Sequence, residues 1–225
     1  MKIAVFIAAY NEEKMIEHVI DDVHTVMSNI IVVDDGSTDT TYQRAEQKGV
    51  VVLQHCINRG KGVAIRTATQ YALEHGVDIL IHFDADGQHH ANDIPKLIEP
   101  ILKGEADVVL GSRFMHPQDS NAPFWRTFML KGAILFSWIF SGIMLSDAHN
   151  GLRAFNRHAL KSIIIREDGF TYASEILDEI RRLTLRYAEV PVTITYSDYS
   201  LHKGQSSWNA IRIAYRLFWR TFFLK

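Results

Sequence analysis

The chain has almost no cysteine, no large excess of charge of either sign and no long apolar run. Its one cysteine, Cys56, excludes an intrachain disulfide and fits a reducing compartment. Nothing beside Cys56 in the sequence would activate its thiol, so we expect it to be a small buried apolar residue. The 24 basic and 26 acidic residues leave a formal net charge of −2, which gives the molecule as a whole no attraction for nucleic acid.

The absence of a long apolar run argues against a membrane-spanning helix. The longest uncharged run lies between Lys131 and Asp147, and it is shorter than the roughly 20 residues that a helix needs to cross a bilayer. The apolar residues 2–9 are followed at once by Asn11-Glu12-Glu13, so we interpret them as a strand and not as a signal peptide. The 225 residues contain no internal repeat and suffice for one good-sized core.

Apolar runs alternate with segments of helical periodicity along most of the chain. Strands are expected at 2–9, 30–33, 50–53, 78–83 and 107–110, and a half-exposed strand at 189–196. Helices are expected from an Asn11 cap to about Met27 and then at about 40–48, 61–74, 93–102 and 171–186. This pattern predicts an α/β fold with a mostly parallel sheet flanked by helices. We expect one domain over 1–207, with an interface and acceptor segment at about 115–145, and a basic amphipathic helix at 208–225.

The strongest chemical signal is Asp84-Ala85-Asp86, which directly follows an apolar strand. Residues i and i+2 of an extended chain point to the same side, so the two carboxylates are presented together. Such a pair suits Mg²⁺ or Mn²⁺, which are usually completed by substrate phosphates. Gln88 is the better neighbour for this metal, whereas His89 and His90 are expected to be a solvated entry to the next helix.

Other polar loops are expected at the same edge of the sheet, because ligands gather at the carboxyl ends of parallel strands. Asp34 and Asp35 suit hydrogen bonds to a base or ribose. Arg59 and Lys61 flank a glycine and can reach a phosphate as cations. The natural ligand of this edge is therefore a nucleoside diphosphate, although each loop alone also fits an ordinary turn.

Two segments suggest contact with a membrane surface. The region from about Trp125 to Leu145 is rich in aromatic residues and has cations at one end, which fits a core helix and an interfacial helix equally well. The last 18 residues, 208–225, place arginines at helical spacing beside aromatic residues and contain no acid, a pattern typical of a membrane-surface or partner-binding helix.

These motifs together resemble the family 2 glycosyltransferases of the GT-A fold, and within them the dolichyl- or polyprenyl-phosphate sugar transferases. The resemblance is carried by residues 9–13, 32–39, 58–62, 83–89, 111–113, 150–155 and 189–191. Two departures stand out. The family usually has proline where Ala8 stands, and residues 204–207 lack the lysine of a G-x-S-K element, so that Lys203 or His202 would have to supply its charge.

The resemblance implies a role for particular residues. The nucleotide sugar would be bound by ten of them: Ala8, Ala9, Tyr10, Glu12, Asp34, Asp35, Lys61, Asp84, Ala85 and Asp86. The metal would be held by Asp84, Asp86 and Gln88, and the acceptor phosphate by Arg113 with Arg126, Lys131 and Lys203 as helpers.

The resulting hypothesis is inverting transfer of a sugar from a UDP- or GDP-linked donor to a polyprenyl phosphate. That acceptor needs no strong base, since the second pKa of a phosphate monoester is about 6. The enzyme would act at the cytoplasmic face of the membrane, bound directly or through a small membrane-protein subunit. One alternative is transfer to a glycan hydroxyl, for which Asp147 or Glu175 would have to act as the base. A second alternative is a nucleotide-binding protein that is recruited to the membrane and catalyses nothing.

Overall fold

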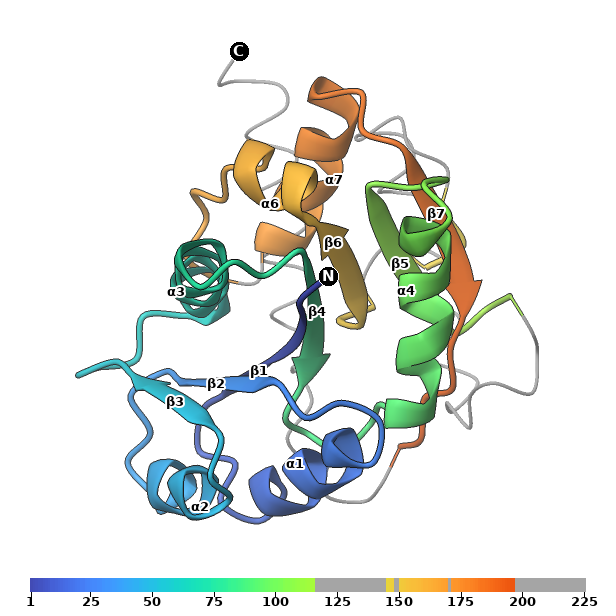
Figure 1. The fold of residues 1–225 in the computed structure, drawn as a ribbon. Helices are drawn as coiled ribbons and strands as arrows, with labels where there is room; N and C mark the ends of the chain where they lie inside the picture. The colour runs from blue at the N-terminus through green and yellow to red at the C-terminus, as the bar shows by residue number, and fades with distance from the viewer. Residues whose placement is uncertain (116–144, 148–149, 170, 197–225) are drawn as a thin grey trace.

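A computed structural model describes residues 1–115, 145–147, 150–169 and 171–196. In this part of the chain one seven-stranded sheet has the order β3-β2-β1-β4-β6-β5-β7 (Figure 1). Its strands are β1 (Ile3–Ala9), β2 (Ile30–Asp34), β3 (Val51–Gln54), β4 (Ile79–Asp84), β5 (Val108–Ser112), β6 (Arg153–Asn156) and β7 (Tyr187–Pro191). β1 to β4 are mutually parallel, whereas β6 runs antiparallel to both β4 and β5, so that β5 and β7 point the same way as β4. The predicted mostly parallel sheet is confirmed.

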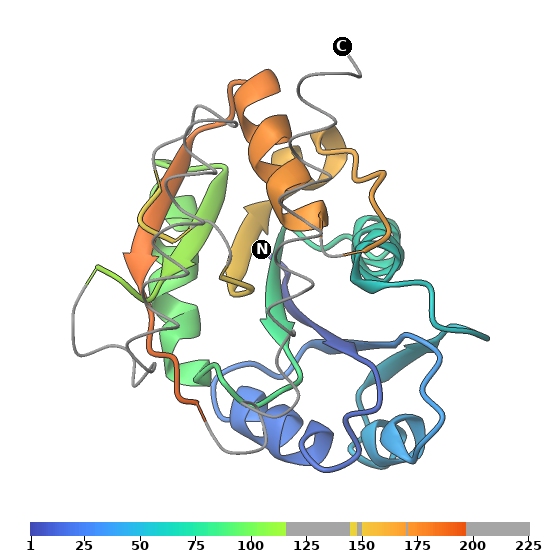
Figure 2. The ribbon, with the colours of Figure 1, turned by 180° about the vertical axis from the view of Figure 1, so that it is seen from behind.

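Helices cover both faces of the sheet. They are α1 (Ile16–His24), α2 (Thr41–Gln47), α3 (Lys61–Glu74), α4 (Ile94–Leu102) after a short 3₁₀ turn η1 (Ala91–Asp93), α6 (Arg157–Ser162) and α7 (Tyr172–Arg182). One core cluster joins the sheet to α3, α6 and α7, and a second joins it to α1, α2 and α4. Figures 1 and 2 show these two sets of helices on opposite sides of the strands.

The alternation of side chains along each strand explains the two clusters. Phe6 and Leu80 belong to the first cluster, whereas their chain neighbours Val5 and Ile79 belong to the second. All four are buried to within 1% of full burial. Burying a side chain of this size contributes roughly 1.5–3 kcal/mol, so both faces of the strands stabilise the fold and the sheet is fixed in register.

Several expected boundaries and burials were wrong. Asn11 does not cap α1, because it has φ of +53° and its side chain accepts a hydrogen bond from the Thr38 amide, 2.9 Å away. The helix begins instead at Ile16, and α7 ends at Arg182, two residues before the left-handed Thr184. Cys56 is exposed, not buried as expected.

β7 was expected at 189–196 but ends at Pro191. The next residues leave the sheet and pair with the loop after β4, through a bridge between His89 and Ile194 and a 3.0 Å hydrogen bond from the Thr195 amide to the Gln88 carbonyl. The chain therefore returns to the carboxyl end of β4 after completing the sheet.

Some predicted residues lie outside the described part of the chain. They are Arg126, Lys131, Lys203, most of the interface segment 115–145 and the whole helix at 208–225. Among the helices that the structure does describe, none has the length and hydropathy to traverse a bilayer.

Candidate functional site

The carboxyl ends of β1, β2, β4 and β5 meet at one edge of the sheet, where the sequence predicted the loops after β1, β2 and β4. Along this edge Ala8 is paired in register with Asp84, and Ala9 with Asp34. Because β6 is antiparallel, its first residue lies at the same edge, preceded by Asn150 and Gly151. The structure thus brings together the loops that carry most of the predicted site residues.

Asp84, at the end of β4, contacts two side chains that can carry positive charge. Its Oδ1 forms an ion pair with Nζ of Lys61, the first residue of α3, and its Oδ2 lies 3.5 Å from Nε2 of His89. Gly151 packs directly against it, since a Cβ at Gly151 would lie 2.7 Å from the Asp84 Cγ. Burial alone would raise the pKa of Asp84, but the positive charge of Lys61 and the contact with His89 hold it well below its usual range.

Asp86 has the opposite electrostatic character. Its pKa lies above the ordinary value, first because the side chain is buried and second because the negative charge of Asp84 is close by. Its Oδ1 accepts a 3.0 Å hydrogen bond from the Gln88 amide, which folds the loop back on itself. The negative charge of one carboxylate makes it harder to ionise the other, and a cation placed between the two stabilises the state in which both are charged.

The expectation that His89 and His90 form a solvated helix entry was wrong for His89. The His89 side chain is only 5% exposed and lies with its ring edge against Phe83, the centroids 5.5 Å apart. Its Nδ1 is buried with no hydrogen-bond partner among the described residues. Adjacent side chains face apart, so one histidine of the pair points inward while His90 contacts the Thr195 hydroxyl.

The arrangement fits a divalent cation that a substrate phosphate completes. Within the described ranges no group of three or more His, Cys, Asp or Glu side chains could enclose a metal ion by itself. Mg²⁺ and Mn²⁺ sites commonly use only one or two carboxylates and leave the remaining positions to water and phosphate. The Lys61 ammonium on Asp84 shows that this position accepts a cation.

The predicted nucleoside side of the edge is made from β1 and β2. Tyr10 is 42% exposed, whereas Glu12, Asp34 and Asp35 are buried. Asp34 accepts hydrogen bonds from the amide and hydroxyl of Ser37 and from the Gln54 side chain at 3.1 Å. Its contacts hold the turn after β2.

Asp35 organises the loop that leads to Lys61. Its Oδ1 lies 2.7 Å from Nδ1 of His55 and accepts from the Arg59 amide, and its Oδ2 accepts from the Gly60 amide at 2.7 Å. His55 continues to the Thr67 hydroxyl through its other nitrogen, 2.9 Å away. Both oxygens of Asp35 thus fix loop residues 55–60. The part that His55 plays in holding this loop was not evident from the local sequence.

Arg113, predicted to face the acceptor phosphate, follows β5 and is 9% exposed. Its Nε donates to Oδ2 of Asp147 at 2.6 Å and its Nη1 to the Tyr196 hydroxyl at 2.8 Å. Asp147 also accepts from the Arg113 amide. The guanidinium is therefore held at the edge of the site by two partners from distant segments.

The segment that carries Asp147 is fixed from β7. The carboxylate of Glu189 accepts hydrogen bonds from the Ser146 amide and hydroxyl, both at 2.9 Å, and from the Asp147 amide at 3.2 Å. The Ser146 hydroxyl also meets that of Ser112 at the end of β5, 2.6 Å away. Glu189 therefore positions Asp147 and, through it, Arg113.

Glu175 was predicted as a base for a hydroxyl acceptor, and its contacts favour another role. It is 4% exposed, and its carboxylate accepts from the backbone amides of Arg166 and Glu167 at 2.9–3.0 Å. Both oxygens are occupied. The side chain anchors the loop between α6 and α7, which packs on the start of α3 through a 2.8 Å hydrogen bond from the Gly62 amide to the Asp168 carbonyl.

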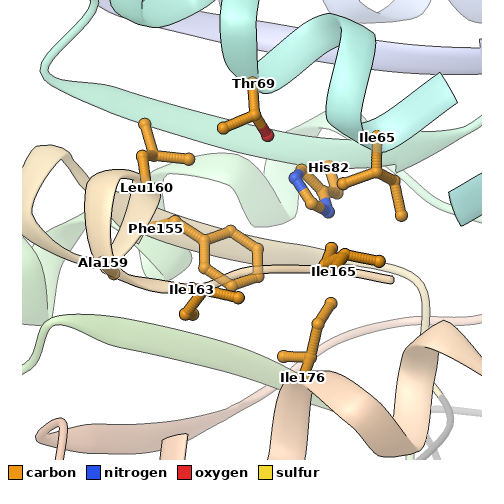
Figure 3. A pocket seen from close by; sticks show the side chains of 9 residues that line it. All are labelled: Ile65, Thr69, His82, Phe155, Ala159, Leu160, Ile163, Ile165 and Ile176. Carbon is orange, nitrogen blue, oxygen red and sulfur yellow. The ribbon is translucent and has the colours of Figure 1, made fainter. Parts of the chain in front are cut away.

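A small cavity lies between α3, α6, α7 and the sheet, beside His82 of β4 (Figure 3). Its volume is about 20 Å³ and its other lining residues are almost all apolar, so it cannot hold a nucleotide sugar. Burial, and then the charge of Arg153, lower the pKa of His82 to about 3. His82 is therefore a neutral core residue, and the open edge described above remains the candidate site.

Comparison with known proteins agrees with this geometry. Residues 4–164 match the model of the glycosyl transferase family 2. A protein of Methanococcus voltae named UDP-N-acetylglucosamine–dolichyl-phosphate N-acetylglucosaminyltransferase is 34% identical, over 99% of this chain and 96% of that one. The undecaprenyl-phosphate mannosyltransferase of Micrococcus luteus is 30% identical, over 86% of this chain and 83% of its own length.

Solved structures show the same fold at lower sequence identity. Glucosyl-3-phosphoglycerate synthase of Mycobacterium tuberculosis, crystallised with Mn²⁺, UDP-glucose and glycerol 3-phosphate, has a TM-score of 0.75 at 23% identity, covering 96% of this chain and 77% of that one. At that identity the likeness establishes the fold. With the family match over most of its length, the chain belongs to the family 2 glycosyltransferases and has their GT-A fold.

Proposed function

We propose that this glycosyltransferase moves a sugar from a nucleoside diphosphate sugar to the phosphate of a polyprenyl phosphate at the cytoplasmic surface of a membrane. Relatives at 30–34% identity carry names that specify dolichyl phosphate and undecaprenyl phosphate, which supports this acceptor class. The proposal includes a divalent metal, Mg²⁺ or Mn²⁺, held by Asp84 and Asp86 with Gln88 beside them. We further propose that 115–145 and 208–225 contact the membrane or a small membrane-protein subunit.

The observation that carries the proposal is the state of the two candidate bases. Asp147 is engaged by Arg113, and both oxygens of Glu175 accept backbone hydrogen bonds. A hydroxyl nucleophile would need one of these carboxylates to take its proton. A phosphate monoester needs no base, since it is already largely dianionic at neutral pH. Among the described residues the site therefore suits a phosphate acceptor better than a hydroxyl.

In the proposed reaction an oxygen of the acceptor phosphate attacks the anomeric carbon. The bond from that carbon to the donor diphosphate breaks, the nucleoside diphosphate leaves, and the anomeric configuration inverts. The metal would supply positive charge to the leaving diphosphate. Lys61, at the start of α3, is placed to add a second cation on the same side, and the helix start favours anions as well.

On the acceptor side, Arg113 supplies the charge. Its Nε and Nη1 are engaged by Asp147 and Tyr196, which fixes the plane of the guanidinium before any ligand arrives. A fixed cation loses little freedom when it binds a phosphate, and this lowers the cost of aligning the nucleophile with the anomeric carbon.

The test is transfer of radiolabel from UDP- and GDP-sugars to undecaprenyl phosphate in detergent, with Mn²⁺ or Mg²⁺ and the purified full chain. We expect labelled lipid in the organic phase. The Asp86→Asn variant is expected to lose at least a hundredfold in rate, and the Asp21→Asn variant, which removes an exposed aspartate paired with Lys48, is expected to retain full activity.

Two results would overturn the proposal. Label transferred only to water-soluble hydroxyl compounds, with none in lipid, would establish the alternative acceptor class. Unchanged turnover by a folded Asp86→Asn protein would remove the metal from the proposed reaction.

A further inference from the structure

Lys61 occupies a cation position at the centre of the donor site. Its Nζ contacts Oδ1 of Asp84, and the two side chains are only 21% and 22% exposed. The ammonium also lies 5.7 Å from the centre of the Tyr172 ring. The ion pair thus joins the first turn of α3 to the end of β4 inside a partly desolvated site.

Close packing fixes the start of α3 and with it the position of the Lys61 backbone. Gly60, with φ of +96°, and Gly62 both face the loop at Glu167 and Asp168. A Cβ at Gly60 would lie 3.0 Å from the Asp168 carbonyl carbon, and one at Gly62 would lie 3.0 Å from the Glu167 carbonyl carbon. The Lys61 backbone is therefore held in place, and only its flexible four-carbon side chain is free to redirect the charge.

The same carboxylate is needed by two cations. A divalent ion bound to Asp84 would meet the ammonium of Lys61 on a shared oxygen, and the two positive charges would repel each other. Phosphate groups placed at the start of α3 would attract the ammonium away from Asp84, since a helix N-terminus and a lysine together favour an anion. Removal of the ammonium would then leave Asp84 open to the metal.

We propose that Lys61 is an internal counter-ion of the metal site, which keeps Asp84 neutralised until a nucleoside diphosphate draws the ammonium to its phosphates. The inference rests on the metal site of the proposed function and adds a consequence to it. The metal binds weakly to the free enzyme and strongly in the presence of the nucleotide, so that metal and donor enter together.

The experiment measures Mn²⁺ binding to the full-length protein by the EPR signal of free Mn²⁺, alone and with UDP or GDP. We expect Lys61→Met to bind Mn²⁺ alone about tenfold more tightly than the unmodified protein. The factor by which the nucleotide improves Mn²⁺ affinity is expected to fall about tenfold or more. Lys61→Arg retains the charge and is expected to bind Mn²⁺ alone as weakly as the unmodified protein.

Lys48→Met is the matched control, because Lys48 pairs with the exposed Asp21 on α1 and its loss changes the net charge equally. It is expected to leave both affinities unchanged. Circular dichroism establishes that each variant is folded.

Two outcomes would overturn the inference, and they are distinguishable. If Lys61→Met binds Mn²⁺ alone with unchanged or lower affinity while the unmodified protein binds Mn²⁺ with nucleotide, the counter-ion role is wrong and the metal site stands. If the unmodified protein fails to bind Mn²⁺ even with UDP or GDP, both the metal site and the counter-ion role are wrong.

Discussion

Replacing Gly151 with alanine is expected to impair the reaction without unfolding the protein. Gly151 precedes β6 and lies against the Asp84 carboxylate. The added Cβ would lie 2.7 Å from the Asp84 Cγ and 2.9 Å from its Oδ1, whereas ordinary contacts begin near 3.4 Å. The Asp84 Oδ2 would lie closer still, so the carboxyl group must move by at least about 0.7 Å, the difference between 3.4 and 2.7 Å. Its contacts with Lys61 and His89 oppose that movement.

The size of the effect follows from this displacement. A misplacement of about 1 Å at a reacting centre costs on the order of a hundredfold in rate. We expect Gly151→Ala to lower kcat/KM for sugar transfer by ten- to a hundredfold, which corresponds to about 1.4–2.7 kcal/mol of transition-state stabilisation. Metal affinity in the presence of nucleotide should fall with it.

The assay is lipid glycosylation over a range of donor concentrations, with Mn²⁺ binding measured on the same samples. Gly169→Ala is the matched control, because a Cβ at Gly169 would have no heavy atom within 4 Å. It is expected to behave as the unmodified protein. Full activity of Gly151→Ala, with an unchanged urea midpoint, would refute the argument that Asp84 must occupy its observed position.

Two further predictions concern stability and acceptor binding. The hydrogen bond from Arg186 is the first cause that lowers the pKa of Asp107 from 3.8 to about 2. The lowered pKa stabilises the fold above pH 4, and this stabilisation is lost as the pH falls toward 2. The shift alone corresponds to about 2 kcal/mol, and we expect about 1 kcal/mol because the Arg186 side chain is 59% exposed and solvent screens its charge. Urea unfolding should therefore show a gap between the unmodified protein and Asp107→Asn at pH 6 that narrows at pH 3, and a gap independent of pH would contradict this. Glu189→Ala should raise KM for polyprenyl phosphate about tenfold while donor KM stays constant, since it frees the segment that positions Arg113; an equal rise in both KM values would count against that role.

Much of the fold could be predicted from local sequence, because apolar runs mark its buried strands and helical spacing of apolar residues marks its helices. The apolar run before Asp84 predicted β4, and helical spacing placed α3 at 61–74, the bounds that the structure shows. Since carboxyl ends of parallel strands share an edge, Asp34, Lys61 and Asp84 were also expected together.

What could not be predicted depends on contacts between distant segments. The four residues of β6 pair with β4 and β5, which are distant in the sequence, and no strand was expected at 153–156. The inward orientation of His89 depends on the bridge to Ile194, more than a hundred residues later. The carboxylate of Glu175 accepts hydrogen bonds from backbone amides of the loop between α6 and α7. The sequence of α7 alone does not determine the path of that loop.

In the proposed reaction the antiparallel β6 acts as a spacer. Neighbouring strands lie about 4.8 Å apart, so inserting β6 between β4 and β5 separates their ends by on the order of 10 Å. Asp84 ends β4 and Arg113 follows β5, so the charges proposed to serve the donor and the acceptor are separated by one intervening strand. In the proposed reaction a single sugar ring must fit between two phosphates. The strand order itself thus sets the width available for the sugar, and a change in β6 would alter that width without changing any charged residue.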